Sequence, residues 1–144
     1  AEEVCRELAA AAEAAPAGFL PQLSAQGQAQ LARYGFVMSV PPGAVLTRQG
    51  HVEREIYIAL AGDFAVERNG QRVAALEAGE VFGEAGFLGA AGTRTATVRA
   101  ERAGRVFVLR RSFLDTLTAQ DPALARDLMR KLARLLSARL PVVT

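Results

Sequence analysis

Glu84 and Arg94, two side chains of opposite charge, stand ten positions apart on either side of a stretch rich in glycine and alanine. Just before them, Val81 and Phe82 are typical of the end of an apolar strand, and Gly83 permits a sharp turn close to a ligand. The residues that follow can form about one helical turn, whose free amide N–H groups and dipole favour an anion. The pattern therefore predicts that a small anion is held between the start of this turn and Arg94.

The carboxylate beside this anion needs a different partner, because an ionised Glu84 can only accept hydrogen bonds. A ligand that carries a phosphate next to a hydroxyl group satisfies both side chains at once. Keeping Glu84 ionised so close to a phosphate requires Arg94 or backbone donors nearby. The alternative is that Glu84 and Arg94 form an internal salt bridge in a domain that binds no ligand.

This pattern extends into a longer motif. The run from Phe82 to Glu84, followed after a short variable stretch by the run from Arg94 to Val98, resembles the phosphate-binding cassette of cyclic nucleotide-binding domains. Turn glycines upstream and Tyr57 also stand where the pattern of that family has them. The resemblance implies that Glu84 binds the ribose 2′-hydroxyl and that Arg94 binds the cyclic phosphate. The ligand-binding residues that it implies are Phe82, Gly83, Glu84, Ala85, Gly86, Arg94, Thr95 and Ala96.

The resemblance implies a regulatory module that is not an enzyme and holds no cofactor or metal. Its ligand would be cyclic AMP or cyclic GMP, and binding would move the flanking helices and so bias an attached or separate effector. One alternative is a roll that has lost ligand binding and serves as a protein-interaction domain. Another is an enzyme on a cupin-like roll, but such enzymes need a histidine-rich metal site and His51 is the only histidine.

The composition bounds the class of protein. The chain has 144 residues, of which 51% are hydrophobic and 22% charged, as expected of a single soluble domain with a real core. No apolar run is long enough to span a membrane. The only cysteine, Cys5, excludes an internal disulfide and fits a reducing compartment. We expect a cytoplasmic location, either alone or as the cytosolic domain of a larger protein such as a membrane protein, and the Ala- and Arg-rich composition suggests a bacterial source.

Positive charge gathers toward the end of the sequence. From Arg102 onward the chain has nine Lys and Arg against three Asp, so this part carries +6 and the rest −4. The simplest interpretation is the solvated face of an amphipathic helix. A nucleic-acid surface is the alternative, but the aromatic residues typical of single-strand binders are not interleaved with these charges, so we expect no direct nucleic-acid contact.

The elements that must position the motif are predicted to be mainly β. Many short strands with regular turns indicate an antiparallel, jelly-roll-like β-roll, with N-terminal helices, a short phosphate-binding helix and two C-terminal helices. Asn69-Gly70 is the strongest hairpin signal, because both residues accept a positive φ. Strands are expected at residues 36–40, 44–47, 55–60, 64–68, 71–76, 81–82, 95–100 and 105–110.

Helices are expected at both ends of the chain. The first spans residues 2–15, and the second follows Ser24 as N-cap. Near the end, Ser112 begins a capping box with Asp115, and Asp121-Pro122 starts a last helix that Pro141 ends. Its apolar stripe is formed by Leu124, Leu128, Leu132, Leu135 and Leu136.

These helices complete the expected domain organisation. We predict an N-terminal helix or linker over residues 1–18 and a binding domain over 19–144, with the roll at about 35–110 and the closing helices at about 112–140. The resemblance implies that the last helix is a lid over the base of the nucleotide, with a contact from somewhere in residues 130–139. Plain core packing and a homodimer surface are alternatives for the same stripe.

Overall fold

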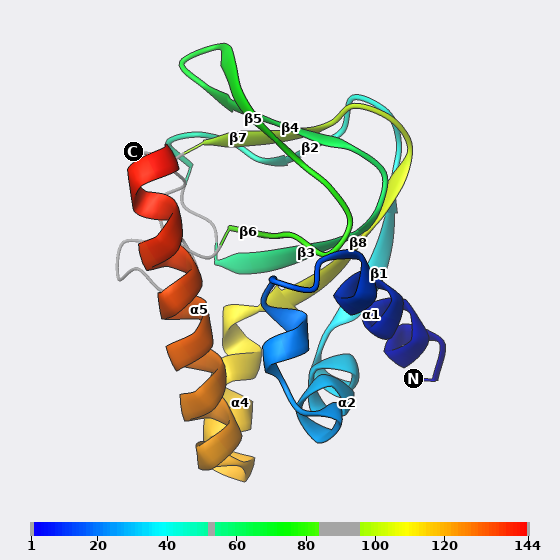
Figure 1. The fold of residues 1–144 in the computed structure, drawn as a ribbon, viewed down its shortest axis with the longest axis vertical. Helices are drawn as coiled ribbons and strands as arrows, with labels where there is room; N and C mark the ends of the chain where they lie inside the picture. Colours follow the sequence, from blue (N-terminus) through cyan, green and yellow to red (C-terminus); the bar gives the residue numbers. More distant parts are fainter. Residues whose placement is uncertain (1, 52–53, 84–95, 144) are drawn as a thin grey trace.

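The computed structural model describes residues 2–51, 54–83 and 96–143, with side chains of the last helix described as far as Leu135. Two antiparallel sheets form a roll, and the helices lie against one of them (Figure 1). The strands are β1 (Phe36–Val40), β2 (Val45–Thr47), β3 (Glu55–Ala61), β4 (Phe64–Arg68), β5 (Gln71–Leu76), β6 (Val81–Phe82), β7 (Thr97–Ala100) and β8 (Gly104–Arg110). The helices are α1 (Glu2–Ala14), α2 (Ala25–Tyr34), α4 (Arg111–Gln120) and α5 (Pro122–Val143), with a 3₁₀ turn η1 (Leu20–Gln22).

The strand order explains the roll. The helix-facing sheet has the order β1-β8-β3-β6, and the outer sheet has the order β2-β7-β4-β5. Every pairing in them is antiparallel. Because β2 and β3 belong to different sheets, as do β6 and β7, the chain crosses repeatedly from one sheet to the other. The predicted mainly-β roll with flanking helices is therefore confirmed, whereas the predicted phosphate-binding helix lies outside the described residues.

The central strands of the helix-facing sheet are apolar on both faces. In β3, Tyr57 and Ala59 point into the roll, while Ile56 and Ile58 point toward the helices. Successive side chains of a strand point to opposite faces, so a strand buried on both sides is a continuous apolar run rather than an alternating one. The sheet consequently separates two cores, one inside the roll and one beneath the helices.

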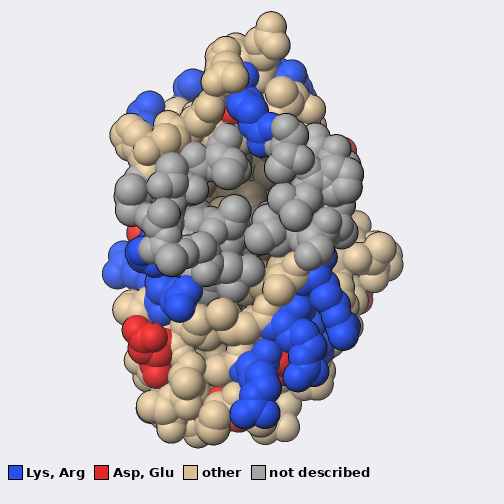
Figure 2. All heavy atoms as spheres, turned by 90° about the vertical axis from the view of Figure 1, so that its left-hand side faces the viewer, with Lys and Arg blue, Asp and Glu red and all other residues tan. Residues whose placement is uncertain are grey.

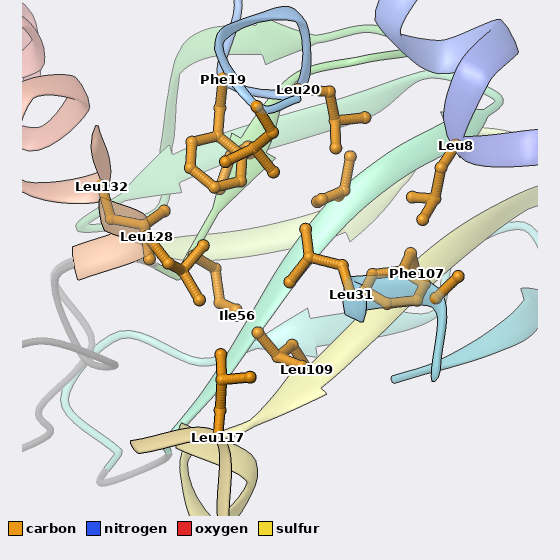
Figure 3. Packing of buried hydrophobic residues seen from close by; sticks show 14 of the residues in the cluster. Leu8, Phe19, Leu20, Leu31, Ile56, Phe107, Leu109, Leu117, Leu128 and Leu132 are labelled. Atoms are coloured by element: carbon orange, nitrogen blue, oxygen red, sulfur yellow. The ribbon is translucent and has the colours of Figure 1, made fainter. Parts of the chain in front are cut away.

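Helices α1 and α5 cover this second core. Leu8 and Ala11 of α1 are buried. Figure 3 shows Leu128 and Leu132 of α5 pointing toward Phe19, which precedes η1, and toward β3. No described helix combines the length and the apolarity that crossing a membrane needs.

Two of the predicted helix boundaries follow local signals in the sequence. The side chain of Ser24 accepts a hydrogen bond of 3.0 Å from the Gly27 N–H and so caps α2. Asp121 Oδ1 accepts a hydrogen bond of 3.1 Å from the Leu124 N–H at the start of α5. Both are N-caps of the expected kind.

Two other boundaries were predicted wrongly. Helix α4 begins at Arg111, directly after β8, so Ser112 lies inside the helix and no side chain caps it. The Arg111 N–H instead donates to the Arg54 carbonyl at 2.9 Å, which satisfies a first-turn donor without a capping box. Pro141 does not end α5, which continues to Val143. The proline lacks only its own N–H donor, and just two residues of the helix follow it.

An ion pair joins α1 to the helix-facing sheet. Arg105 donates to both carboxylate oxygens of Glu7, at 2.7 and 3.0 Å, and also to Ser39 Oγ at 2.9 Å. These bonds span from α1 across β8 to β1, so they hold the N-terminal helix on the roll. The predicted boundary near residue 18 stays a prediction.

This pair makes the docking of α1 dependent on pH. The hydrogen bonds from Arg105 hold the pKa of the Glu7 carboxyl below its ordinary value. Because the folded-state pKa is the lower one, the stabilisation is complete above the unfolded-state pKa of about 4.3 and is lost as the pH falls through the folded value. We expect Glu7→Gln to lower the melting temperature at pH 7 and to lower it much less at pH 3. An equal loss at both pH values would contradict a role for the ionised carboxylate.

Candidate functional site

The segment predicted to bind the anion leaves the roll at a tightly packed strand end. Phe82 of β6 is 3% exposed and pairs with Tyr57 of β3. The two rings are stacked, with centroids 5.0 Å apart and an angle of 11° between their planes. Phe64 of β4 contacts the same Phe82 ring, with the centroids 5.8 Å apart. Aromatic stacking has a preferred geometry in addition to apolar contact, so Phe82, the first residue of the motif, is held firmly.

The chain then turns at Gly83. This residue has a φ of +85°, which confirms the predicted need for glycine at the turn. Just upstream, the Gly79 N–H donates to the Ala59 carbonyl at 2.7 Å, and the Ala59 N–H donates to the Glu80 carbonyl at 2.9 Å. The approach to the predicted site is therefore tied to the centre of the helix-facing sheet by two hydrogen bonds.

The chain returns to the outer sheet at Ala96, which is held in place by a contact that the sequence did not reveal. Thr47 of β2 is 2% exposed, and its hydroxyl donates to the Ala96 carbonyl at 3.0 Å and accepts from the Val98 N–H at 3.1 Å. The β2–β7 register shifts between Val45 and Thr47, so a side chain takes the place of a regular ladder bond. Ala96, one of the predicted ligand-binding residues, is thus positioned from a strand about fifty residues earlier in the sequence.

A hydrogen bond connects the residues that hold the Phe82 end of the segment to those that hold its Ala96 end. The hydroxyl of Tyr57, whose ring stacks on Phe82, donates to the carbonyl of Leu46 at 3.3 Å. Leu46 is the neighbour of Thr47 in β2, so the bond links the helix-facing sheet to the outer sheet. The ends of the segment that carries Glu84 and Arg94 are therefore anchored to one buried framework.

We expect Thr47→Val to test this anchor. Valine has nearly the same shape but lacks the hydroxyl, so it leaves the Val98 N–H and the Ala96 carbonyl without their partner. A buried unsatisfied polar group costs about 1–3 kcal/mol of unfolding free energy. Thr97→Val is the matched control, because among the described residues the bond that Thr97 Oγ1 makes is an exposed one, accepted from the Gln49 N–H at 3.0 Å. Urea denaturation of both variants measures the difference, and equal losses would contradict the anchoring role of Thr47.

The structure thus places three of the eight predicted ligand-binding residues. Phe82 and Gly83 lie on one side of the segment and Ala96 on the other. Both halves of the alternative salt bridge and the remaining predicted ligand contacts lie outside the described residues; these are Glu84, Ala85, Gly86, Arg94 and Thr95. Thr47 and Leu46 were missed because nothing in the local sequence marks them: their roles depend on which strands pair.

The described part of the chain offers little for metal chemistry. Within it, no three His, Cys, Asp or Glu side chains lie close enough together to hold a metal ion. What the framework can do is hold Gly83 and Ala96, the two described ends of the predicted binding segment, in fixed positions. An anion-binding loop needs such ends, since its backbone donors must be aimed before the ligand arrives.

Known proteins resemble this chain in both sequence and architecture. The family model for the cyclic nucleotide-binding domain matches residues 37–121, more than half of the chain. Over 94 residues the chain is 35% identical to cGMP-dependent protein kinase, isozyme 1, of Drosophila melanogaster. That match covers 65% of this chain and 12% of the kinase, so the chain corresponds to a small part of that relative.

Solved structures agree with the sequence matches. A cyclic nucleotide-binding domain from Methylobacillus flagellatus superimposes with a TM-score of 0.77 at 25% identity, covering 84% of this chain and 70% of that one. The catabolite activator protein of Thermus thermophilus gives a TM-score of 0.71 at 26% identity, covering 85% of this chain and 58% of that one. With the family model matched across most of the roll, the chain belongs to the cyclic nucleotide-binding domain family.

Proposed function

We propose that this chain is a regulatory module that binds cyclic AMP or cyclic GMP and relays binding to an effector. The observation that carries the proposal is the framework around the cassette motif. Buried Tyr57 and Thr47 hold the two ends of the segment that contains Glu84 and Arg94. Membership of the family supports the choice of a cyclic nucleotide as the anion.

Each end of the motif has a separate role in the proposal. Arg94 binds the cyclic phosphate, because its planar guanidinium can meet two phosphate oxygens. Glu84 accepts a hydrogen bond from the ribose 2′-hydroxyl, which distinguishes a ribonucleotide from a simple anion. The other proposed contacts come from backbone N–H groups or from the loop lining, at Phe82, Gly83, Ala85, Gly86, Thr95 and Ala96.

The proposed relay runs through the helices. Gly79 precedes the cassette by a few residues, and a Cβ atom at this position would lie 2.5 Å from the Ala11 carbonyl and 2.6 Å from the Ala15 Cβ atom. The end of α1 therefore rests directly on the chain that enters the cassette. We propose that ligand free energy shifts these contacts, together with α5 as the lid, and so biases a partner.

The module itself is proposed to be non-catalytic and to act in the cytoplasm. The Drosophila relative is a kinase by name, but the match covers only 12% of it, so any catalytic activity would belong to other parts of a larger protein. Because that relative is named for its dependence on cGMP, cyclic GMP is a candidate equal to cyclic AMP. A homodimer through α5 is an alternative to a separate effector, and a non-binding roll that serves protein contacts is the second candidate function.

Titration calorimetry on the chain, stripped of carried-over ligand, tests the proposal. We expect micromolar or tighter binding of cyclic AMP, cyclic GMP or both, and much weaker binding of the linear 5′-AMP and 5′-GMP. The ratio of the two cyclic affinities identifies the preferred messenger. Ligand at a hundred times its Kd should also stabilise the fold by about 2.7 kcal/mol. A chain that melts cooperatively but binds neither cyclic nucleotide would favour the protein-interaction alternative.

A further inference from the structure

Helix α5 carries a row of exposed arginines on its outward face. Arg126, Arg130 and Arg134, here called the arginine ridge, are all exposed, whereas Leu128 and Leu132 of the same helix are buried. At 3.6 residues per turn the three arginines share one side of the helix, opposite the buried leucines. Figure 2 looks at the side of the molecule where α5 lies and shows Lys and Arg gathered in a diagonal band.

The ridge has no counter-charge in the described part of the molecule. No hydrogen bond or ion pair joins its three guanidinium groups to any described residue. The neighbouring carboxylate of Asp127 pairs instead with Lys131 at 2.8 Å. Like charges four residues apart destabilise a helix, so the ridge weakens α5 unless an anionic partner offsets the repulsion.

The geometry of the ridge fits another helix. With a rise of 1.5 Å per residue, the arginines repeat about every 6 Å along the axis. Carboxylates placed at four-residue intervals on a partner helix repeat at the same distance. Ala123 and Ala133 are exposed on the same side of α5, and such small side chains allow a second helix to approach closely.

Other anionic partners fit the ridge less well. In the described part of the chain the exposed large hydrophobic residues are Phe36 on β1 and Val73 on β5, neither of them on α5. The face therefore lacks the aromatic rings on which single-stranded nucleic acids stack. As far as Leu135, it also lacks exposed large apolar side chains of the kind with which an amphipathic helix enters a lipid surface.

We propose that the arginine ridge docks an acidic helix of a partner protein, with Glu or Asp at four-residue intervals. Each guanidinium can pair with a carboxylate through two parallel hydrogen bonds, which sets the register of the two helices as well as their attraction. The docking uses the face of α5 that points away from the core, so its test does not require a nucleotide.

The test is an NMR titration of the ¹⁵N-labelled chain at low salt. The probe is an alanine-based helical peptide with Glu at every fourth position, and the comparison peptide has Gln at the same positions. We expect the Glu peptide to shift the amide signals of residues 126–134 and the Gln peptide to leave them unchanged. The triple variant R126Q/R130Q/R134Q should weaken binding by roughly ten- to hundredfold, as the loss of three exposed ion pairs implies.

A matched variant separates the ridge from net charge. R6Q/R33Q/R48Q removes the same charge from exposed positions elsewhere and should weaken binding by less than about threefold. The control variant should melt like the parent chain, because its three side chains are exposed, and the ridge variant should melt at the same or a slightly higher temperature, because the repulsion along α5 is removed. Equal weakening by the two variants, or equal binding of the Glu and Gln peptides, would overturn the proposal. So would ridge-dependent binding of oligo-dT or of phosphatidylserine vesicles without binding of the Glu peptide.

Discussion

Replacing Arg94 with alanine is expected to weaken cyclic nucleotide binding by about ten- to hundredfold. A charge-assisted hydrogen bond is worth about 1.5–3 kcal/mol, roughly twice a neutral one. Because each 1.4 kcal/mol is about a factor of ten, the loss of one such contact gives this range. The loss would be larger if the phosphate were left buried without a partner. Titration calorimetry on stripped protein measures the change.

Arg99→Ala is the matched control for this experiment. Arg99 lies in β7, five residues after Arg94, and pairs with Glu67 of β4 at 3.5 Å with much of its side chain exposed. We expect nucleotide affinity to stay within about twofold of the parent value, since an exposed pair of this kind contributes little. Unchanged affinity in Arg94→Ala would mean that another group holds the phosphate.

The melting temperatures of the ligand-free proteins distinguish an internal salt bridge between Glu84 and Arg94 from a ligand-binding role for the two residues. If Glu84 and Arg94 paired mainly with each other, Glu84→Ala and Arg94→Ala would lower the melting temperature of the ligand-free chain by similar amounts. If they are binding residues, both should lower the affinity while leaving that melting temperature almost unchanged. The two hypotheses can be separated because an internal salt bridge would stabilise the chain without any ligand, whereas binding residues would not.

Gly79→Ala is expected to lower the unfolding free energy by about 2–5 kcal/mol. Two effects add at this position. The φ of +90° is strained for any residue with a Cβ atom, and the new Cβ would lie 2.5 Å from the carbonyl oxygen of Ala11. Since that oxygen is backbone, the clash can be relieved only by moving α1 or the chain that enters the cassette. Urea denaturation measures the stability.

Gly70→Ala separates the strain from the clash. Gly70 also has a positive φ, +78°, in the hairpin between β4 and β5, but a Cβ atom added there would have no other atom within 4 Å. We expect it to cost only about 1–2 kcal/mol, from backbone strain alone. Gly79→Ala should in addition lower nucleotide affinity, because α1 rests on the approach to the cassette. An equal loss of unfolding free energy in the two variants would show that α1 can move away from this contact without destabilising the fold.

Much of the fold could be predicted because its signals are local. The Asn69-Gly70 hairpin is an example: both residues have positive φ, 54° and 78°, as its type of turn requires. The Ser24 cap and the alternating or continuous apolar runs are likewise properties of a few neighbouring residues. The family, too, was predicted correctly from the cassette motif, because the residues that form this motif lie close together in the sequence.

The two boundary errors have a common cause. Ser112 and Pro141 carry valid local signals, but their surroundings override them. The Arg54 carbonyl, from a segment more than fifty residues earlier, satisfies the start of α4, and a helix that already packs along the core tolerates a proline in its last turn. Local preferences of about 1 kcal/mol are easily outweighed by such tertiary contacts.

The sequence by itself determined the family, the order and type of the described α-helices and strands, and the residues proposed to meet the ligand. Only the tertiary structure showed that Thr47 holds Ala96, that Tyr57 links the two sheets, and that Glu7 joins α1 to Arg105. The partners in these contacts are up to 98 residues apart in the chain. Which residues become neighbours at that separation is decided by strand order and register, and no local pattern of residues encodes it.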